Sequence, residues 1–195
     1  MEERGLKLSD EKTVITNIND GFDFLGWNFR KFKEKLLIQP SRKSKQKVTK
    51  SLSRTVKYYH EASQELLIIK LNQITRGWAE YHHSVCAKKT YALIDHRLWE
   101  MLWKWAKRRH PRKGRKWIKN RYWHPKENRE WSFRTDRAIL YQMMDMPIVR
   151  IRSLDLKKNP FLDSDYFERR RKQHKKDKET AYFSSTAALS GYYAL

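Results

Sequence analysis

Residues 63–82 read SQELLIIKLNQITRGWAEYH, and their apolar positions recur every three or four residues. The stripe consists of Leu67, Leu71, Ile74, Trp78 and Tyr81. This spacing places the side chains on one face of an α-helix about four turns long. Ser63 precedes the stripe and is a suitable N-cap, because its hydroxyl can accept a hydrogen bond from a first-turn amide. The segment therefore predicts an amphipathic helix that needs a partner for its apolar face.

Two more segments show the same period. One begins at about Gln46, and its stripe is Val48, Leu52, Thr55 or Val56, and Tyr59. The other begins at Thr90, a candidate N-cap, and its stripe is Tyr91, Ile94, Leu98, Met101 or Leu102, and Trp105. It ends at His110, since the residue before Pro111 avoids helical backbone angles. Three amphipathic helices can share one core, so we predict a mainly α fold built on a three-helix bundle.

The segments on either side of these helices differ from them. Apolar runs at 22–29 and 36–38, joined by a charged turn at 31–35, predict a β-hairpin. Pro40 is expected to end its second strand, because proline cannot donate to a sheet. Beyond Gly114 the helical period is lost although aromatic residues continue. We therefore predict a small irregular basic module after the bundle.

The charge of the chain indicates its class of partner. Lysine and arginine number 44 against 22 acidic residues, which leaves a net charge of +22. Such an excess favours a polyanionic partner, because it raises both the encounter rate with phosphate backbones and the affinity for them. No apolar run approaches the roughly 20 residues that span a bilayer, and the basic segments lack the pattern of an interfacial helix. We expect nucleic acid and no membrane.

The densest basic run is 104–121, which holds ten lysines and arginines and no acid. The phosphate contacts predicted there are Lys104, Lys107, Arg108, Arg109, Arg112, Lys113, Arg115, Lys116, Lys119 and Arg121. A second cluster enters the first helix and comprises Arg42, Lys43, Lys45, Lys47 and Lys50. Arg76 is expected either to pair with an acid on the helix surface or to reach RNA. Counterion release makes such contacts a source of affinity without sequence preference.

The remaining candidate residues belong to the core. They are Leu71, Ile74, Gly77, Trp78, Tyr81, Leu98, Trp99 and Trp105. A glycine inside a helix costs roughly 1 kcal/mol relative to alanine, so Gly77 is expected to admit a neighbouring aromatic ring. Stacking on unpaired bases is the expected use for Trp103, Trp117 and Trp123 if any tryptophan has it, because these lie nearest the basic run.

Several blocks of the sequence resemble the group II intron reverse transcriptase/maturase family, in the family's order. ERGL at 3–6, EKT at 11–13 and GFDFLG at 21–26 look like the last block of the polymerase palm. LNQITRGWAEY at 71–81 is similar to the hallmark of the maturase-specific domain, also called domain X or thumb. LIDHRLW at 93–99 and WKWAKRRHP at 103–111 resemble its distal helix. The resemblance implies a helical thumb that grips structured intron RNA, followed by a DNA-binding segment.

The resemblance also implies a division of the chain. Residues 1–40 would be a palm remnant with the β-hairpin, and 41–115 the thumb. Residues 116–166 would be an irregular DNA-binding-like segment, and 167–195 a basic linker, or solvated helix, with a truncated tail.

The sequence departs from the family where catalysis would lie. The family's polymerase uses Tyr-x-Asp-Asp, and no Asp-Asp pair occurs here. We therefore expect no catalytic residue and no reverse transcription by this chain alone; Mg²⁺ would belong to an absent palm or to the intron RNA. His82 and Cys86 are too few for a zinc site, and Cys86 is expected to be a partly buried thiol. The acid pairs 163/165 and 136/145 are not expected to bind a metal either.

The function we expect is that of a truncated maturase from a mobile element. It would bind group II intron RNA and promote the RNA fold that is competent for splicing. One alternative is the C-terminal subunit of a split reverse transcriptase whose palm is supplied by another polypeptide, and another is a decayed relic. Target DNA is a further candidate ligand. A single cysteine and no secretory leader indicate a bacterial cytoplasm or an organelle rather than secretion.

Overall fold

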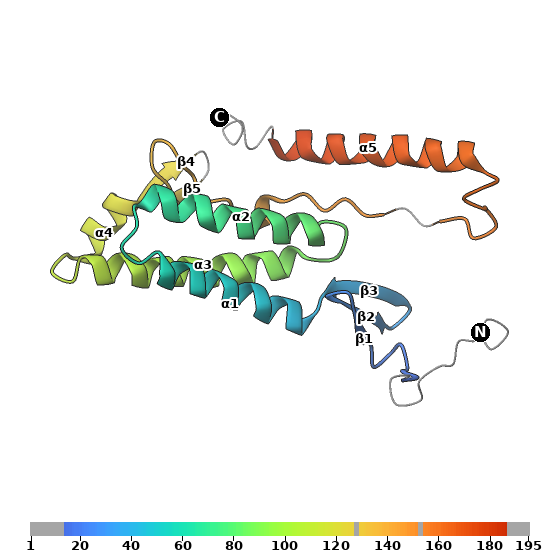
Figure 1. The fold of residues 1–195 in the computed structure, drawn as a ribbon, viewed down its shortest axis with the longest axis horizontal. Coiled ribbons are helices and arrows are strands. Elements are labelled where there is room, and N and C mark those ends of the chain that lie inside the picture. Colours follow the sequence, from blue (N-terminus) through green and yellow to red (C-terminus); the bar gives the residue numbers. More distant parts are fainter. Residues whose placement is uncertain (1–13, 127–128, 152–153, 187–195) are drawn as a thin grey trace.

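The computed structural model describes residues 14–126, 129–151 and 154–186, and it is mainly α as predicted. Its elements in order are β1 (Phe22–Phe24), β2 (Trp27–Phe32), β3 (Lys35–Pro40), α1 (Arg42–Tyr58), α2 (Gln64–His82), α3 (Lys88–Arg109), α4 (Arg115–Tyr122), β4 (Trp123–Lys126), β5 (Arg129–Phe133), the 3₁₀ turn η2 (Met143–Asp145) and α5 (Ser164–Thr186). Figure 1 shows α1, α2 and α3 side by side, with β1–β3 at one end and α4, β4 and β5 at the other. The palm-like blocks at 3–6 and 11–13 lie outside the described residues.

The three-helix bundle is present as predicted, and its apolar stripes meet in one core. The fully buried side chains of this core include Leu52 of α1, Leu67, Ile68 and Leu71 of α2, and Ile94, Leu98 and Leu102 of α3. Burying each such side chain contributes roughly 1.5–3 kcal/mol relative to leaving it in water. The bundle therefore derives its stability from the same residues whose spacing predicted it.

The helix starts agree with the prediction in one of three cases. Ser63 caps α2, since its hydroxyl accepts a first-turn N–H at 3.2 Å. α1 begins before Gln46, because Ser41 caps it in the same way at 3.1 Å. The prediction for Thr90 is wrong: the N-cap of α3 is Ala87, which makes no side-chain cap, and Thr90 is a buried residue inside the helix.

The predicted β-hairpin is present as β2 and β3, and β1 adds a third strand, so the segment is an antiparallel sheet in the order β1-β2-β3. The predicted first strand, 22–29, is cut by a reversal that pairs Phe24 with Trp27. Leu25 and Gly26 form this turn with positive φ angles of 47° and 82°. Glycine adopts such angles readily and leucine rarely does, so strand propensity alone misses the turn. Pro40 ends β3 as predicted.

The segment after Gly114 follows the bundle as predicted, but it contains short regular elements that the sequence did not predict. Its α4 helix buries Ile118 and Tyr122, and β4 pairs with β5 in an antiparallel hairpin. Trp123 and Phe133 of that hairpin join the bundle core. A helix of eight residues is too short for a clear stripe, and a register shift after His124 breaks the alternation of β4.

The chain after β5 returns along the bundle (Figure 1) and is tied to it by polar side chains, among them Asn72 and Asp95. Asn72 donates to the Ile139 carbonyl and accepts from the Tyr141 N–H, both at 2.8 Å. The Asp95 carboxylate accepts from the amides of Met143 and Met144 at 3.0 and 2.9 Å. These bonds fix η2 against α3, because each satisfies backbone groups that no helix or sheet pairs.

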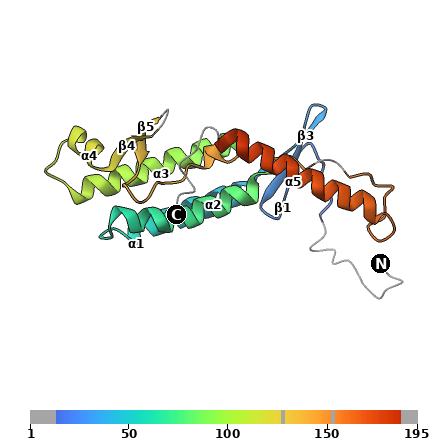
Figure 2. The same ribbon diagram turned by 90° about the horizontal axis from the view of Figure 1, so that it is seen from above.

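The basic segment 167–178 was expected to be a linker or a solvated helix, and it is part of the helix α5. This helix extends past the sheet end of the bundle in Figure 2. Near its C-terminal end, Lys178 Nζ and the Tyr182 hydroxyl both donate to the Glu80 carboxylate of α2, at 2.6 and 2.5 Å. Tyr182 also contacts Met146. One partly buried carboxylate thus anchors α5 to the bundle.

The sheet is held to the bundle by the buried imidazole of His82. Trp27 Nε1 of β2 donates to His82 Nδ1 at 2.9 Å, so Nδ1 carries no proton and Nε2 carries it. Nε2 then donates to the Ser44 hydroxyl of α1 at 3.1 Å. The same hydroxyl accepts from Trp78 Nε1 at 3.1 Å. Four polar groups from three elements are thereby satisfied around one neutral ring.

Acid is expected to destabilise the fold through this ring. Burial lowers the pKa of His82 from 6.5 to about 4. Between these two pH values the imidazole is protonated in the unfolded chain and neutral in the folded chain. The stability that depends on a neutral His82 is complete above pH 6.5 and is lost as the pH falls toward 4. Urea unfolding followed by circular dichroism at pH 7, 5.5 and 4.5 measures this loss.

The matched variant is His82→Gln, whose amide can replace both hydrogen bonds without titrating. It should flatten the decline between pH 6.5 and 4.5 and leave the decline caused by carboxylates at lower pH. An equal pH dependence in both proteins would contradict a neutral His82.

Candidate nucleic-acid interface

The basic run of the sequence forms one end of the bundle, at the end of α3, the following loop and α4 (Figure 1). We name this surface the basic end; its members are Lys104, Lys107, Arg108, Arg112, Lys113, Arg115, Lys116, Lys119 and Arg121. All are exposed except the half-buried Lys119. No Asp or Glu within the described ranges pairs with any of them, so the positive charge faces solvent uncompensated.

Arg109 differs from these residues because its guanidinium is already engaged. Its Nη1 donates to the carbonyls of His60 and Ala62 at 3.0 and 2.8 Å. The guanidinium also lies over the Trp105 ring, 4.7 Å from its centroid. Arg109 therefore fastens the α1–α2 loop to α3, and its predicted phosphate contact would compete with these bonds.

The second predicted cluster continues farther along α1 than the sequence analysis assumed. Five exposed cations step by four and three residues along one face: Lys43, Lys47, Lys50, Arg54 and Lys57. We name this row the α1 stripe. It lies opposite the buried Val48, Leu52 and Val56, and α1 contains no acid. Arg42 is also exposed and Lys45 is half-buried at the start of the helix.

The α1 stripe runs from the sheet end toward the basic end over about 20 Å, at 1.5 Å per residue. Arg54 and Lys57 were missed as site residues because the first basic cluster was treated as a run in the sequence. Their spacing of three and four residues from Lys50 was the signal that places them on the same face.

The tryptophans divide into packing residues and surface residues. Trp105 is buried, and its indole donates to the Tyr59 carbonyl at 3.3 Å. Trp78 and Trp99 are half-buried against the core. Trp123 is 2% exposed and cannot stack on a base at the surface, whereas Trp117 is 39% exposed within the basic end. The ammonium group of Lys113 lies 5.4 Å from the Trp117 ring centroid.

Two predicted core residues lie on the surface instead. Gly77 is exposed, and a Cβ added there would meet nothing within 4 Å, so the predicted close packing is wrong. Tyr81 is 49% exposed, although its ring stacks on Trp27 and its hydroxyl donates to the Leu25 carbonyl at 2.6 Å. The buried face of α2 contains Thr75, Ala79 and His82, and Gly77 and Tyr81 lie outside this face. Leu71, Leu98 and Trp105 are buried, and Ile74 packs against the core.

Arg76 does not form the first of its two predicted contacts, an ion pair with a described acid, and its contact with RNA stays a prediction. Its guanidinium lies 5.4 Å from the centroid of the Tyr141 ring, and it makes no ion pair with a described acid. The side chain remains exposed beside Gly77. It therefore stays available to an anionic ligand from this side of α2.

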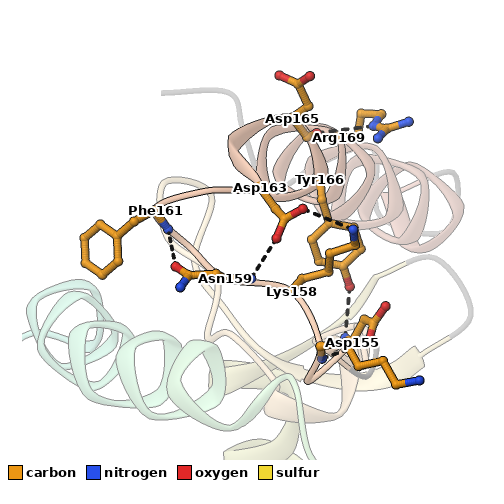
Figure 3. A network of polar contacts seen from close by, with 9 residues as sticks. Asp155, Lys158, Asn159, Phe161, Asp163, Asp165, Tyr166 and Arg169 are labelled. Carbon is orange, nitrogen blue, oxygen red and sulfur yellow. Dashed lines mark hydrogen bonds and ion pairs between the residues drawn. The ribbon is translucent and has the colours of Figure 1, made fainter.

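Two of the four carboxylates considered for a metal site, Asp163 and Asp145, serve structural purposes. Figure 3 shows Asp163 in the turn before α5, where it accepts from the Asn159 amide at 2.9 Å and from Lys158 Nζ at 3.1 Å. These bonds lower the pKa of Asp163. Asp145 pairs with Arg129, whose Nη1 donates to Oδ2 at 2.7 Å. No group of three His, Cys, Asp or Glu side chains within the described residues could hold a metal ion.

Cys86 is exposed, so its prediction as a partly buried thiol is wrong. Its backbone amide donates to the Ile38 carbonyl at 2.9 Å, which holds the residue at the surface between α2 and the sheet. Separately, no helix in the described part of the chain is both long and apolar enough to cross a membrane.

The helical region is similar to one known family of domains. Residues 42–123 match the family described as "Group II intron, maturase-specific domain". The match begins with α1 and ends at Trp123, so it includes the α1 stripe and the basic end. A search of curated proteins finds no significant match.

The exposed Gly77 leads to a stability prediction. Gly77→Ala should raise the free energy of unfolding by up to about 1 kcal/mol, because alanine favours the helix and the added methyl group meets no neighbour. Thermal unfolding followed by circular dichroism measures the change. The control is Gly26→Ala, which should destabilise the fold because Gly26 has a φ of 82°. A destabilising Gly77→Ala would show that this position is packed after all.

Proposed function

We propose that this chain binds structured group II intron RNA and favours its splicing-competent fold, because residues 42–123 match the group II intron maturase-specific domain. The observation that carries the proposal is the cationic surface of this domain. It combines the α1 stripe and the basic end, and no described acid pairs with either. The role is binding rather than bond-making.

Electrostatics supports RNA as the ligand. Cations that are exposed and unpaired in the free protein bind phosphates without first breaking an ion pair. Each contact releases a condensed counterion, which is the main source of affinity for nucleic acids. The α1 stripe is straight, because it lies on a single helix, and the basic end continues it around the end of the bundle. A surface of this form can follow more than one segment of a folded RNA.

Promotion of a particular RNA fold follows from differential affinity. A compact intron brings phosphates from several helices close together, where they repel one another. A protein surface that contacts all of them binds the compact fold more tightly than open folds and shifts the population toward it. No chemical step by the protein is needed for this effect.

A split reverse transcriptase remains the second candidate function, on one observation. The sheet exposes large apolar side chains, among them Phe22, Phe24, Leu25, Phe32 and Leu36, at 42–66% of their surface. Unpaired strands with such residues favour association with another polypeptide. Under this alternative, reverse transcription would appear only after a palm-bearing polypeptide is added to the chain.

The α1 stripe generates the first binding prediction. Replacing Lys47, Lys50 and Arg54 together by alanine should lower the slope of log affinity against log salt by about 2–3, since each lost phosphate contact removes 0.7–0.9. The control replaces Arg169, Lys172 and Lys176 of α5, which are exposed and remove the same charge outside the matched domain. Equal slopes for the two variants would show that net charge alone governs binding.

The specificity of the proposed function is tested with two RNAs. The purified chain should bind a folded group II intron more tightly than an unrelated structured RNA of equal length, and the ratio should persist as salt rises. Filter binding across 50–300 mM salt measures both affinities. Affinities that are equal at every salt concentration would contradict recognition of the intron.

A further inference from the structure

A cavity of about 480 Å³ lies between α3, the β4–β5 hairpin and the segment that follows it. Its lining includes Asp95, His96, Trp99, Trp131, Tyr141 and Gln142. The volume is within the usual range for sites that bind small molecules or single nucleotides, about 300–1,000 Å³. Neither the α1 stripe nor any cation of the basic end lines it.

Flat aromatic rings form most of one wall. His96, Trp99 and Trp103 follow one another along a face of α3, and adjacent rings are nearly parallel, with interplanar angles of 12° and 13°. The Trp131 ring from β5 packs against Trp99 at 6.3 Å between centroids. Trp131 is nevertheless 39% exposed. An exposed indole on a fixed aromatic support is the arrangement on which bases stack in single-strand binding proteins.

Polar groups lie at the same cavity. The Gln142 amide can donate and accept, as the Watson–Crick edge of a base does, and the His96 imidazole is exposed at the wall. Trp123, also in the lining, is 2% exposed, and its indole N–H has no hydrogen-bond partner in the described chain. This nitrogen is buried, so Trp123 contributes its ring and not its N–H to the lining of the cavity.

Positive charge beside the cavity selects the kind of ligand. The ammonium group of Lys119 lies 4.7 Å from the Trp131 ring centroid, and Lys119 belongs to the basic end. A phosphate at the basic end is therefore only a short distance from the aromatic wall. An apolar ligand without phosphate would gain nothing from this charge.

We propose that this cavity binds one unpaired base of an RNA whose backbone lies on the basic end. The inference rests on the proposed RNA-binding function and adds to it a site that distinguishes unpaired from paired nucleotides. The base stacks against Trp131 and Trp99, and its edge meets Gln142. Base-paired nucleotides cannot enter, because their edges and faces are already occupied.

Three hairpin RNAs of equal length test the proposal against the full chain. One is fully paired, one has a single bulged nucleotide, tried with each of the four bases, and one has an abasic residue at the bulge. The wild-type chain should bind at least one bulged RNA about 5- to 150-fold more tightly than the abasic RNA, the range expected for stacking of one base. The two RNAs have the same length and charge and differ only by the presence of the base at the bulge.

Two tryptophans provide matched variants. Trp131 and Trp117 are each 39% exposed and each lies under a lysine, but only Trp131 lines the cavity. Trp131→Ala should abolish the preference for the bulged RNA and leave the salt slope unchanged, whereas Trp117→Ala should keep the preference. His96→Ala, at an exposed position of α3, should reduce the preference for the bulged RNA. Because this change lies outside the β4–β5 hairpin, it serves as a second variant if Trp131→Ala misfolds the hairpin. Circular dichroism detects such misfolding.

Equal binding of bulged and abasic RNAs by the wild-type chain would overturn the proposal, and so would a preference that survives in folded Trp131→Ala and His96→Ala. Neither outcome affects the comparison of intron with unrelated RNA. Conversely, a chain that prefers the bulge but does not distinguish the intron keeps the cavity as a base site and loses the proposed function.

Discussion

The neutral imidazole of His82 is the interaction on which the arrangement of the molecule depends. It accepts from Trp27 of β2 and hydrogen-bonds Ser44 of α1, while it belongs itself to α2. With Ser44 fixed in this way, the start of α1 has one orientation. Val48 and Leu52 then face the core, and the lysines half a turn away must face solvent. A polar contact inside the protein thus determines where the charge outside it lies.

How far the fold could be predicted depended on the length of each element. Helices α1, α2 and α3 span 17 to 22 residues, long enough for a stripe to repeat several times. The eight residues of α4 allow no such repetition, and the turn at Leu25 uses a backbone angle that its residue type argues against. Gly77 was misplaced because a helical glycine suggests close packing, whereas here it simply lies on the open face.

The parts of the candidate site that are local in the sequence could be predicted, and the parts that tertiary contacts bring together could not. The basic end was predictable because its residues are consecutive, and a run without acids keeps its charge in any fold. The α1 stripe required the phase of the helix as well as the composition. The aromatic cavity could not be predicted, since its walls come from Trp99, Trp131 and Gln142. The β4–β5 hairpin brings Trp131 to α3, and the bonds that fix η2 bring Gln142 there.

The two surfaces would contribute differently to recognition of an RNA. Phosphate contacts are the same for every sequence and weaken together as salt rises, so the α1 stripe and the basic end supply affinity but little discrimination. Stacking of a base in a largely apolar cavity depends weakly on salt and requires a nucleotide that is free of its pair. Lys119 belongs to the basic end and also touches Trp131, so the two kinds of contact meet at one residue. An RNA whose backbone lies on the basic end would bind more tightly if it also had an unpaired base at the position of the cavity. Binding alone could in this way distinguish one RNA fold from another.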